Sequence, residues 1–168
     1  MHTKKKLKLG ISACLLGEKV RYDGGHKLDR FITETLGLQF ELLPFCPEVE
    51  CGLPVPREAM QLVGDSGSPR VITIETRIDR TEQVLRWVET GLYTIDEQHI
   101  CGYVFKARSP SCGVCDAEIV APSGGLTEKG PGLFARAVMQ RFPLLPVIDE
   151  EGLAVPEARN GFLERVRG

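Results

Sequence analysis

The chain has 168 residues, of which 42% are hydrophobic and 26% are charged, and its formal net charge is -2. This length suits one globular domain with a substantial core and is too short for two large domains. A slightly acidic chain argues against a surface that coats nucleic acid, and no apolar run is long enough for a signal peptide or a transmembrane helix. We therefore expect a cytoplasmic protein whose cysteines are reduced, metal-bound or redox-active rather than joined in disulfides.

Apolar residues alternate between strand-like and helix-like spacing along the chain. The expected extended segments are residues 7–13, 39–45, 71–75, 102–107 and 144–148. The expected helices are residues 28–36, 81–90, 133–142 and 158–166, with Gly37 and Gly91 placed to end the first two. This order predicts an α/β fold, a three-layer α/β/α arrangement with a mostly parallel, Rossmann-like sheet, in which residues 1–168 form a single domain.

Five of the six cysteines lie in three loops rich in Gly, Pro and Ser, and only Cys101 lies outside them. The loops begin near Cys14, Cys46 and Ser109, and each follows an expected strand. In parallel sheets, ligands bind outside the carboxyl ends of the strands. The three loops should therefore converge on one edge of the sheet and form a shared site.

The cysteine spacing alone permits several kinds of site. Cys46, Cys51, Cys112 and Cys115 are a possible zinc set for a zinc-stabilised binding module, which would leave Cys14 unused. Cys112 and Cys115 alone form a CxxC pair for a dithiol oxidoreductase, although residues 116–120 behind them look extended rather than helical. The cysteines could also be small buried hydrophobic residues, an interpretation that fits Cys101 best.

An iron–sulfur cluster accounts better for the polar and small residues around these cysteines. Clusters take thiolate ligands from loops, with backbone N–H groups and small residues close to the sulfur atoms, and Gly17, Gly52 and Gly113 stand at suitable places. If only three cysteines bind a four-iron cluster, one iron keeps an open position and can act as a Lewis acid toward a soft atom such as sulfur.

Three separated motifs resemble the thiouracil desulfidase family, formerly a domain of unknown function, over about residues 9–149. They are ISACLLG with VRYDG (residues 11–17 and 20–24), CPEV with GLPVPR (46–49 and 52–57), and Lys106 with SPSCG (109–113). The resemblance implies a [4Fe-4S] cluster held by Cys14, Cys46 and Cys112, whose fourth iron takes sulfur from a thiolated pyrimidine. Thiouracil or 4-thiouridine monophosphate would lose its sulfur as hydrosulfide, without net electron transfer, in a role in sulfur metabolism.

The chain departs from the family pattern in two respects. Cys51 and Cys115 stand where the pattern does not require cysteine, so either could be a spectator, a sulfur acceptor or a fourth ligand. Residues 102–112 and 132–146 resemble members that carry a second, C-terminal domain, and we expect this chain to be a stand-alone desulfidase domain.

Within this resemblance, Glu48 follows the expected ligand Cys46 by two residues and is our candidate for the base that activates the attacking water. A loop or helix cap is the alternative role for Glu48. Ser109 should donate a hydrogen bond to the substrate or to the water, and Ser111 is the second candidate because it adjoins a ligand. A turn hydroxyl is the alternative for Ser109.

Cationic and aromatic residues in or beside the motif loops are candidates for binding a nucleotide phosphate or stacking on a pyrimidine. They are Arg21, Tyr22, Lys27, Arg57 and Lys106. Each of them alone is more often a solvated or ion-paired surface residue. The expected partner is a small thiolated pyrimidine, with no membrane and no nucleic-acid polymer, and the sequence does not indicate an oligomeric state.

Overall fold

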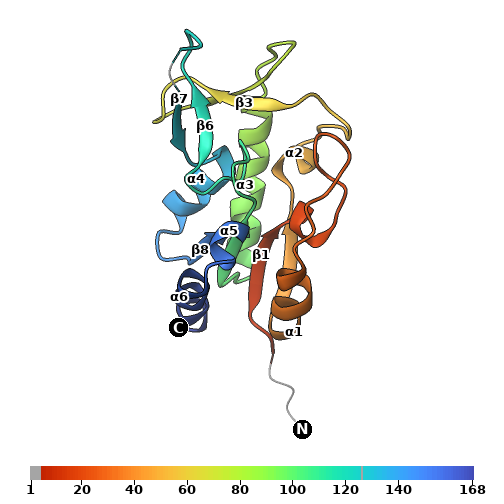
Figure 1. The fold of residues 1–168 in the computed structure, drawn as a ribbon, viewed down its shortest axis with the longest axis vertical. Helices are drawn as coiled ribbons and strands as arrows, with labels where there is room; N and C mark the ends of the chain where they lie inside the picture. The colour runs from red at the N-terminus through yellow and green to blue at the C-terminus, as the bar shows by residue number, and fades with distance from the viewer. Residues whose placement is uncertain (1–4, 126) are drawn as a thin grey trace.

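The computed structural model describes residues 5–125 and 127–168, and its centre is a sheet of four parallel strands in the order β2-β1-β5-β8 (Figure 1). We call it the parallel sheet. Its strands are β1 (Lys8–Ser12), β2 (Glu41–Phe45), β5 (Gly102–Phe105) and β8 (Val147–Asp149). All four overlap expected extended segments. Helices cover both faces of a parallel sheet, so its strands are rich in apolar residues and can be recognised in the sequence.

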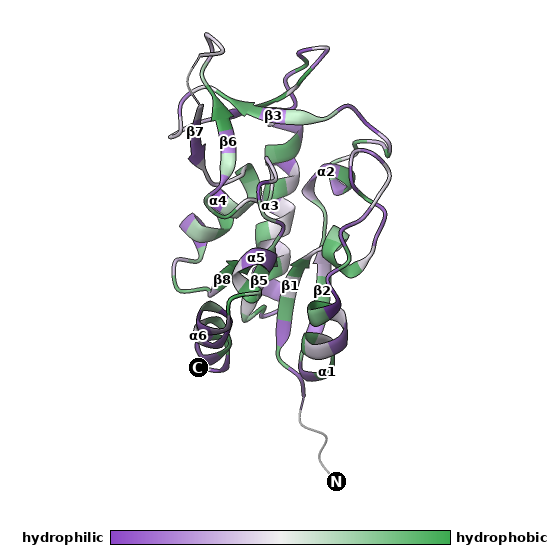
Figure 2. Cartoon of the chain, in the orientation of Figure 1, coloured by the Kyte–Doolittle hydropathy of each residue, from purple (hydrophilic) through white to green (hydrophobic). Residues whose placement is uncertain are grey.

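Helices cover both faces of the parallel sheet. The helices on one face are α3 (Thr81–Glu97) and α4 (Leu133–Arg141), which pack against Tyr103 and Phe105. The opposite face, with Ile11 and Val104, packs against a second group of helices. That group consists of η2 (Ile32–Leu36), α5 (Glu150–Leu153) and α6 (Pro156–Arg167); α1 (Gly37–Gln39) continues η2 and has no buried residue. The α/β fold with three layers is therefore confirmed, and Figure 2 shows hydrophobic strands at its centre and a hydrophilic α6 outside.

A second, mixed sheet was not expected from the sequence. Its strands are β3 (Met60–Val63), β4 (Arg70–Thr73), β6 (Ala117–Val120) and β7 (Thr127–Gly130), in the order β4-β3-β6-β7. The β3–β6 pair is parallel, and the β3–β4 and β6–β7 pairs are antiparallel. Leu62, Val71 and Ile119 of this sheet share one hydrophobic core with Tyr103 and Phe105 of the parallel sheet. The expected strand at 71–75 thus belongs to the second sheet.

Neither glycine that was expected to end a helix does so. Gly37 has ordinary right-handed dihedral angles, φ -63° and ψ -19°, and the helical run continues through Gln39. Gly91 lies inside α3, where a Cβ would come within 2.8 Å of both Phe134 and Trp87. Its role is to let two aromatic side chains approach the helix. Among the described residues, no helix is long and apolar enough to cross a membrane.

Candidate active site

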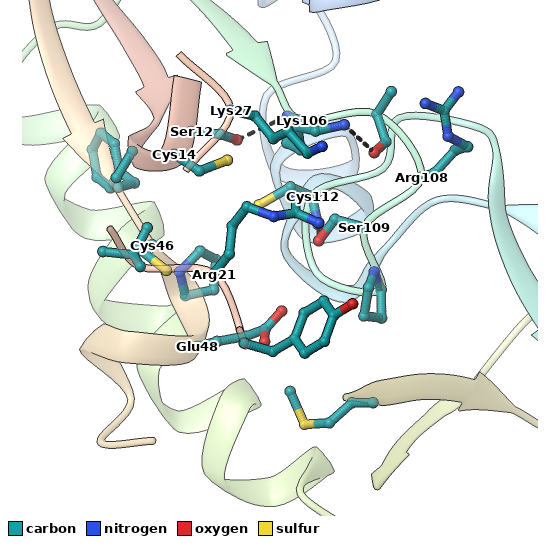
Figure 3. Close-up of a pocket in the computed structure, with 18 of the residues that line it drawn as sticks. Ser12, Cys14, Arg21, Lys27, Cys46, Glu48, Lys106, Arg108, Ser109 and Cys112 are labelled. Atoms are coloured by element: carbon teal, nitrogen blue, oxygen red, sulfur yellow. Dashed lines mark hydrogen bonds between the residues drawn. The ribbon is translucent and has the colours of Figure 1, made fainter. Parts of the chain in front are cut away.

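The three motif cysteines line one cavity of about 390 Å³ at the carboxyl ends of the parallel strands (Figure 3). Cys14 lies in the short helix η1 (Ala13–Leu16) directly after β1, Cys46 directly follows β2, and Cys112 lies in the loop after β5. Cys14 and Cys112 are buried, with exposures of 8% and 6%, and Cys46 is half-buried. The structure therefore brings the three cysteines together from segments far apart in the sequence.

Local hydrogen bonds hold the first two cysteine loops in place. Gly17 ends η1 with a left-handed φ of 89°, and the Lys27 N–H returns to donate to the Cys14 carbonyl at 2.9 Å. Cys46 precedes α2 (Pro47–Glu50), and its N–H donates to the Glu50 carboxylate at 2.6 Å. This contact satisfies a backbone donor at the start of the helical turn, so that α2 begins at the cysteine.

The third loop is a tight turn built around Ser109. The Ser109 hydroxyl oxygen accepts hydrogen bonds from the N–H groups of Ser111 and Cys112, both at 3.1 Å. The Gly113 N–H donates to the Ser109 carbonyl, and a Cβ at Gly113 would lie 2.9 Å from that oxygen. Glycine is therefore required at 113, and the turn fixes both the Cys112 backbone and the Ser109 hydroxyl at the cavity.

Burial controls the ionisation of the three thiols. It raises the pKa of Cys46 to about 11, raises that of Cys14, and raises that of Cys112 well above its ordinary value. Such thiols stay protonated at neutral pH unless a bound metal replaces the proton. These cysteines therefore suit metal ligation better than free nucleophilic chemistry.

The arrangement suits a cluster and not a single ion. Within 5–125 and 127–168, no three His, Cys, Asp or Glu side chains lie close enough together to hold one metal ion. Cys51 instead donates to the Glu48 carbonyl at 3.1 Å and borders a separate hollow, while Cys115 is exposed. The four-cysteine zinc site is thus not formed. A four-iron cluster spreads its thiolate ligands over several iron atoms, and three thiols around a cavity match that donor set.

The Glu48 carboxylate lies at the cavity and is held on both oxygens. Arg57 Nε donates to Oε1 at 3.0 Å, and the Ser111 hydroxyl donates to Oε2 at 3.0 Å. The Glu48 and Arg57 side chains are only 15% and 7% exposed. Ser111 is buried and supports Glu48, and it is not among the residues that line the cavity. Oε1 also lies 3.0 Å from Arg57 Nη2, whereas Oε2 keeps a second acceptor position for a ligand or water.

Two of the expected phosphate-binding cations are already paired with protein groups. Besides Glu48, Arg57 donates to the carbonyls of Val20 and Pro54 at 2.9 and 3.2 Å. Lys106 Nζ pairs with Glu150 at 2.7 Å and donates to the neighbouring Ala107 carbonyl. We call Arg57 and Lys106 the paired cations. Both line the cavity, but their charges are balanced before any ligand arrives.

The other expected ligand-binding residues, Arg21, Tyr22 and Lys27, also line the cavity. Arg21 is half-buried, with its guanidinium 5.9 Å from the centre of the exposed Tyr22 ring, and Lys27 is exposed. Neither Arg21 nor Lys27 forms an ion pair with an acidic side chain in the part of the chain that the structure describes. We call these two residues the unpaired cations. Figure 3 shows Arg21 among the three cysteines in this view.

The model of the 2-thiouracil desulfurase family matches residues 9–150. The chain belongs to this family. A solved structure described as the [4Fe-4S]-dependent thiouracil desulfidase TudS is 32% identical, with a TM-score of 0.72, over 94% of this chain and 97% of that one. The uncharacterized protein YbbK of Bacillus subtilis (strain 168) is 28% identical over 109 residues, which cover 61% of this chain and 71% of YbbK. The family resemblance of the motifs is confirmed.

The cavity also contains residues that the sequence did not single out. Ser12 ends β1, and its hydroxyl accepts the Lys106 N–H at 2.9 Å. Ser12 stands close to Cys14 at the end of an expected strand, so its place in the sequence was a sign that it lies at the site. Arg108 lines the cavity and pairs with Glu151, and Met60 reaches it from β3. Met60 could not be found from the sequence because the second sheet was not expected.

Proposed function

We propose that this protein removes sulfur from a thiolated uracil compound, with a [4Fe-4S] cluster held by Cys14, Cys46 and Cys112. The observation that carries the proposal is the convergence of these three thiols on one cavity, in a chain of the 2-thiouracil desulfurase family. The description of TudS as a [4Fe-4S]-dependent thiouracil desulfidase supports the same cofactor and reaction. When bound, such a cluster supplies a Lewis-acidic iron that accepts the sulfur of the substrate.

Glu48 is the proposed base that takes a proton from the water attacking the substrate carbon. Arg57 and Ser111 fix its two oxygens, so the carboxylate keeps one orientation toward the cavity without losing all of its acceptor positions. This geometry assigns Arg57 and Ser111 as positioning residues. A base held in one orientation avoids the entropic cost of finding the reacting geometry.

Ser109 is the proposed hydrogen-bond donor to the substrate or to the attacking water. Its oxygen accepts from two backbone N–H groups, which leaves the hydroxyl proton for a third partner. Ser109 lines the cavity, so that partner can be a ligand. The turn role and the ligand role of this hydroxyl are therefore compatible.

We further propose that the substrate is 4-thiouridine monophosphate rather than the free base. The unpaired cations Arg21 and Lys27 provide charge for a phosphate, and Tyr22 beside them provides a ring for stacking. The paired cations contribute less to this preference because Glu48 and Glu150 already balance them. We also propose that the protein is cytoplasmic, because a reducing compartment fits its six free cysteines. The hydrophobic core that both sheets share supports a single domain.

The test is anaerobic purification or reconstitution of the protein, with its absorption spectrum, iron and sulfide content, and turnover of 4-thiouridine monophosphate and 2-thiouracil. The proposal expects about four irons and four sulfides per chain, as a [4Fe-4S] cluster contains, and equal amounts of hydrosulfide and uracil product. A colourless protein with one tightly bound zinc, or a filled cluster without desulfuration of any thiolated uracil compound, would contradict it.

A further inference from the structure

Ser12 places a buried polar side chain at the wall of the cavity. The residue ends β1, the strand between β2 and β5, and it is 2% exposed. It lines the cavity together with the three candidate ligands Cys14, Cys46 and Cys112. The proposed reaction assigns no role to its hydroxyl group, so the contacts of this group need an explanation.

The neighbouring strand fixes the position of the Ser12 hydroxyl. Its oxygen accepts a hydrogen bond at 2.9 Å from the N–H of Lys106, which directly follows β5 (Figure 3). A serine hydroxyl has one proton and two acceptor positions, so this contact leaves the proton to be donated elsewhere. Among the residues that the structure describes, no oxygen or nitrogen atom accepts it. Because burial has removed water, a buried hydroxyl without an acceptor is costly.

The surroundings of the hydroxyl offer sulfur atoms as acceptors. Ser12 precedes Cys14 by two residues. Its partner across the sheet is Phe45, which directly precedes Cys46. Burial raises the pKa of the Cys112 thiol well above its ordinary value, and a hydrogen bond with the Ser12 side chain is the largest opposing cause. Figure 3 shows Ser12 in the same part of the cavity as Cys14 and Cys112.

A metal would strengthen such a contact. A protonated thiol is a weak acceptor, whereas a thiolate that binds iron carries negative charge and accepts hydrogen bonds more strongly. A hydrogen bond to a ligand sulfur draws electron density away from the iron, which raises the reduction potential of a cluster. It also makes the iron a stronger Lewis acid, which is the property that the proposed reaction needs.

We propose that Ser12 is a positioning residue whose hydroxyl, held by the Lys106 N–H, donates a hydrogen bond to the Cys112 sulfur when this sulfur binds the iron–sulfur cluster. The proposal rests on the proposed function, because it requires the cluster. The hydrogen bond orients Cys112 as a ligand, slows the loss of the cluster and raises its reduction potential. Ser12 acts through Cys112 and does not contact the substrate.

The test compares Ser12→Ala with Thr81→Val. Thr81 is buried, is not among the residues that line the cavity, and its hydroxyl accepts the Val71 N–H at 2.9 Å. Each variant therefore removes one buried hydroxyl that accepts a backbone N–H, but only Ser12→Ala removes a hydroxyl from the cavity. Thermal unfolding of the cluster-free proteins should show that both variants are less stable than the wild type.

The reduction potential and the rate of cluster loss to a chelator are then measured on the proteins loaded with iron and sulfide. We expect Ser12→Ala to have a more negative potential and to lose its cluster roughly 2- to 10-fold faster, as for one lost hydrogen bond. Thr81→Val should match the wild type in both. An active cluster whose potential is unchanged in Ser12→Ala, or is shifted equally in both variants, would overturn this proposal alone. A wild-type protein that takes up no iron would reject both this proposal and the proposed function.

Two further measurements do not depend on the folding of Ser12→Ala. Ser12→Thr keeps the hydroxyl and should have nearly the potential of the wild type, so a more negative potential would contradict the proposal. A crystal structure of the loaded wild-type protein should place Ser12 Oγ within hydrogen-bonding distance of Cys112 Sγ. An Oγ that donates to a backbone carbonyl or to water in that structure would overturn the proposal.

Discussion

The paired cations, Arg57 and Lys106, and the unpaired cations, Arg21 and Lys27, border the same cavity but differ in what they can offer a ligand. The side chains of the first two are 7% and 11% exposed and pair with Glu48 and Glu150, whereas Arg21 is half-buried without an acidic partner among the described residues and Lys27 is exposed. A ligand phosphate that took Arg57 from Glu48 would leave a buried carboxylate without its partner, which is costly. Of these four residues, only the unpaired cations are free to contribute their charge to binding.

This difference teaches that the number of positive residues near a site does not measure the charge available for recognition. Arg57 contacts Glu48, so we expect it to act on the orientation of this carboxylate and thus on the reaction rather than on phosphate binding. Arg21 has no such partner in the described parts of the chain and should act on the substrate directly. If this division is correct, substitutions at the two pairs will change different quantities, kcat for the paired Arg57 and KM for the unpaired Arg21.

The largest effect is expected from Cys14→Ser. Serine does not replace a thiolate ligand of iron, so the cluster and all desulfuration should be lost together. Iron content, the absorption spectrum and turnover are measured. Cys115→Ser and Cys51→Ser are the controls, because neither residue lines the cavity, and both should keep a filled cluster. Full iron content and turnover in Cys14→Ser would show that the three-ligand assignment is wrong.

Replacing Glu48 by Gln should lower kcat by about 10²–10⁴-fold, the usual contribution of a general base, while iron content and KM change little. The amide keeps the shape of the side chain but cannot take the proton from water. Glu118→Gln is the matched control on an exposed position of β6 and should have normal kinetics. Normal turnover of Glu48→Gln would leave Glu48 with a structural role only.

Arg57→Gln should reduce kcat and also destabilise the fold by about 3–5 kcal/mol, because it leaves the Glu48 carboxylate buried without its ion-pair partner. Thermal unfolding and steady-state kinetics measure the two effects. If Arg57 acts through Glu48, the double variant Glu48→Gln/Arg57→Gln should lose no more activity than Glu48→Gln alone. Additive losses of activity would mean that Arg57 contacts the substrate itself.

Arg21→Ala should raise the KM for 4-thiouridine monophosphate by about 10–100-fold, as for one lost hydrogen bond to a charged group, and leave the KM for 4-thiouracil nearly unchanged. Iron content should stay at the wild-type level. Arg30→Ala removes an exposed arginine that pairs with Glu34 and should change neither constant. An equal effect of Arg21→Ala on the base and the monophosphate would contradict the phosphate role of the unpaired cations.

The smallest effects concern two helical glycines, Gly91 in α3 and Gly161 in α6. Gly91→Ala should destabilise the protein by about 1 kcal/mol, since overpacking against Trp87 and Phe134 outweighs the better helix propensity of alanine. Gly161→Ala in α6 is the control, because its Cβ would meet nothing within 4 Å, and it should stabilise by up to about 1 kcal/mol. Thermal unfolding of the cluster-free proteins measures both, and the same sign for both would refute this packing role of Gly91.

The sequence by itself determined which segments form the strands of the parallel sheet, the succession of strands and helices along the chain, and the loops that carry Cys14, Cys46 and Cys112. Apolar periodicity is a local property, and the strand-ending loops of a parallel sheet meet at one edge, so these features follow from short stretches of chain. The motifs also sufficed to identify the family, which the match over residues 9–150 confirms.

Only the tertiary structure decided which side chains pair across the site and where the second sheet lies. Strand β7, with the residues TEKG, has no apolar alternation and forms because β6 pairs with it. The partner of Lys106 lies 44 positions away, at Glu150, and Gly91 meets Phe134 of another helix. Such contacts depend on segments distant in the sequence, and local propensity contains no information about them.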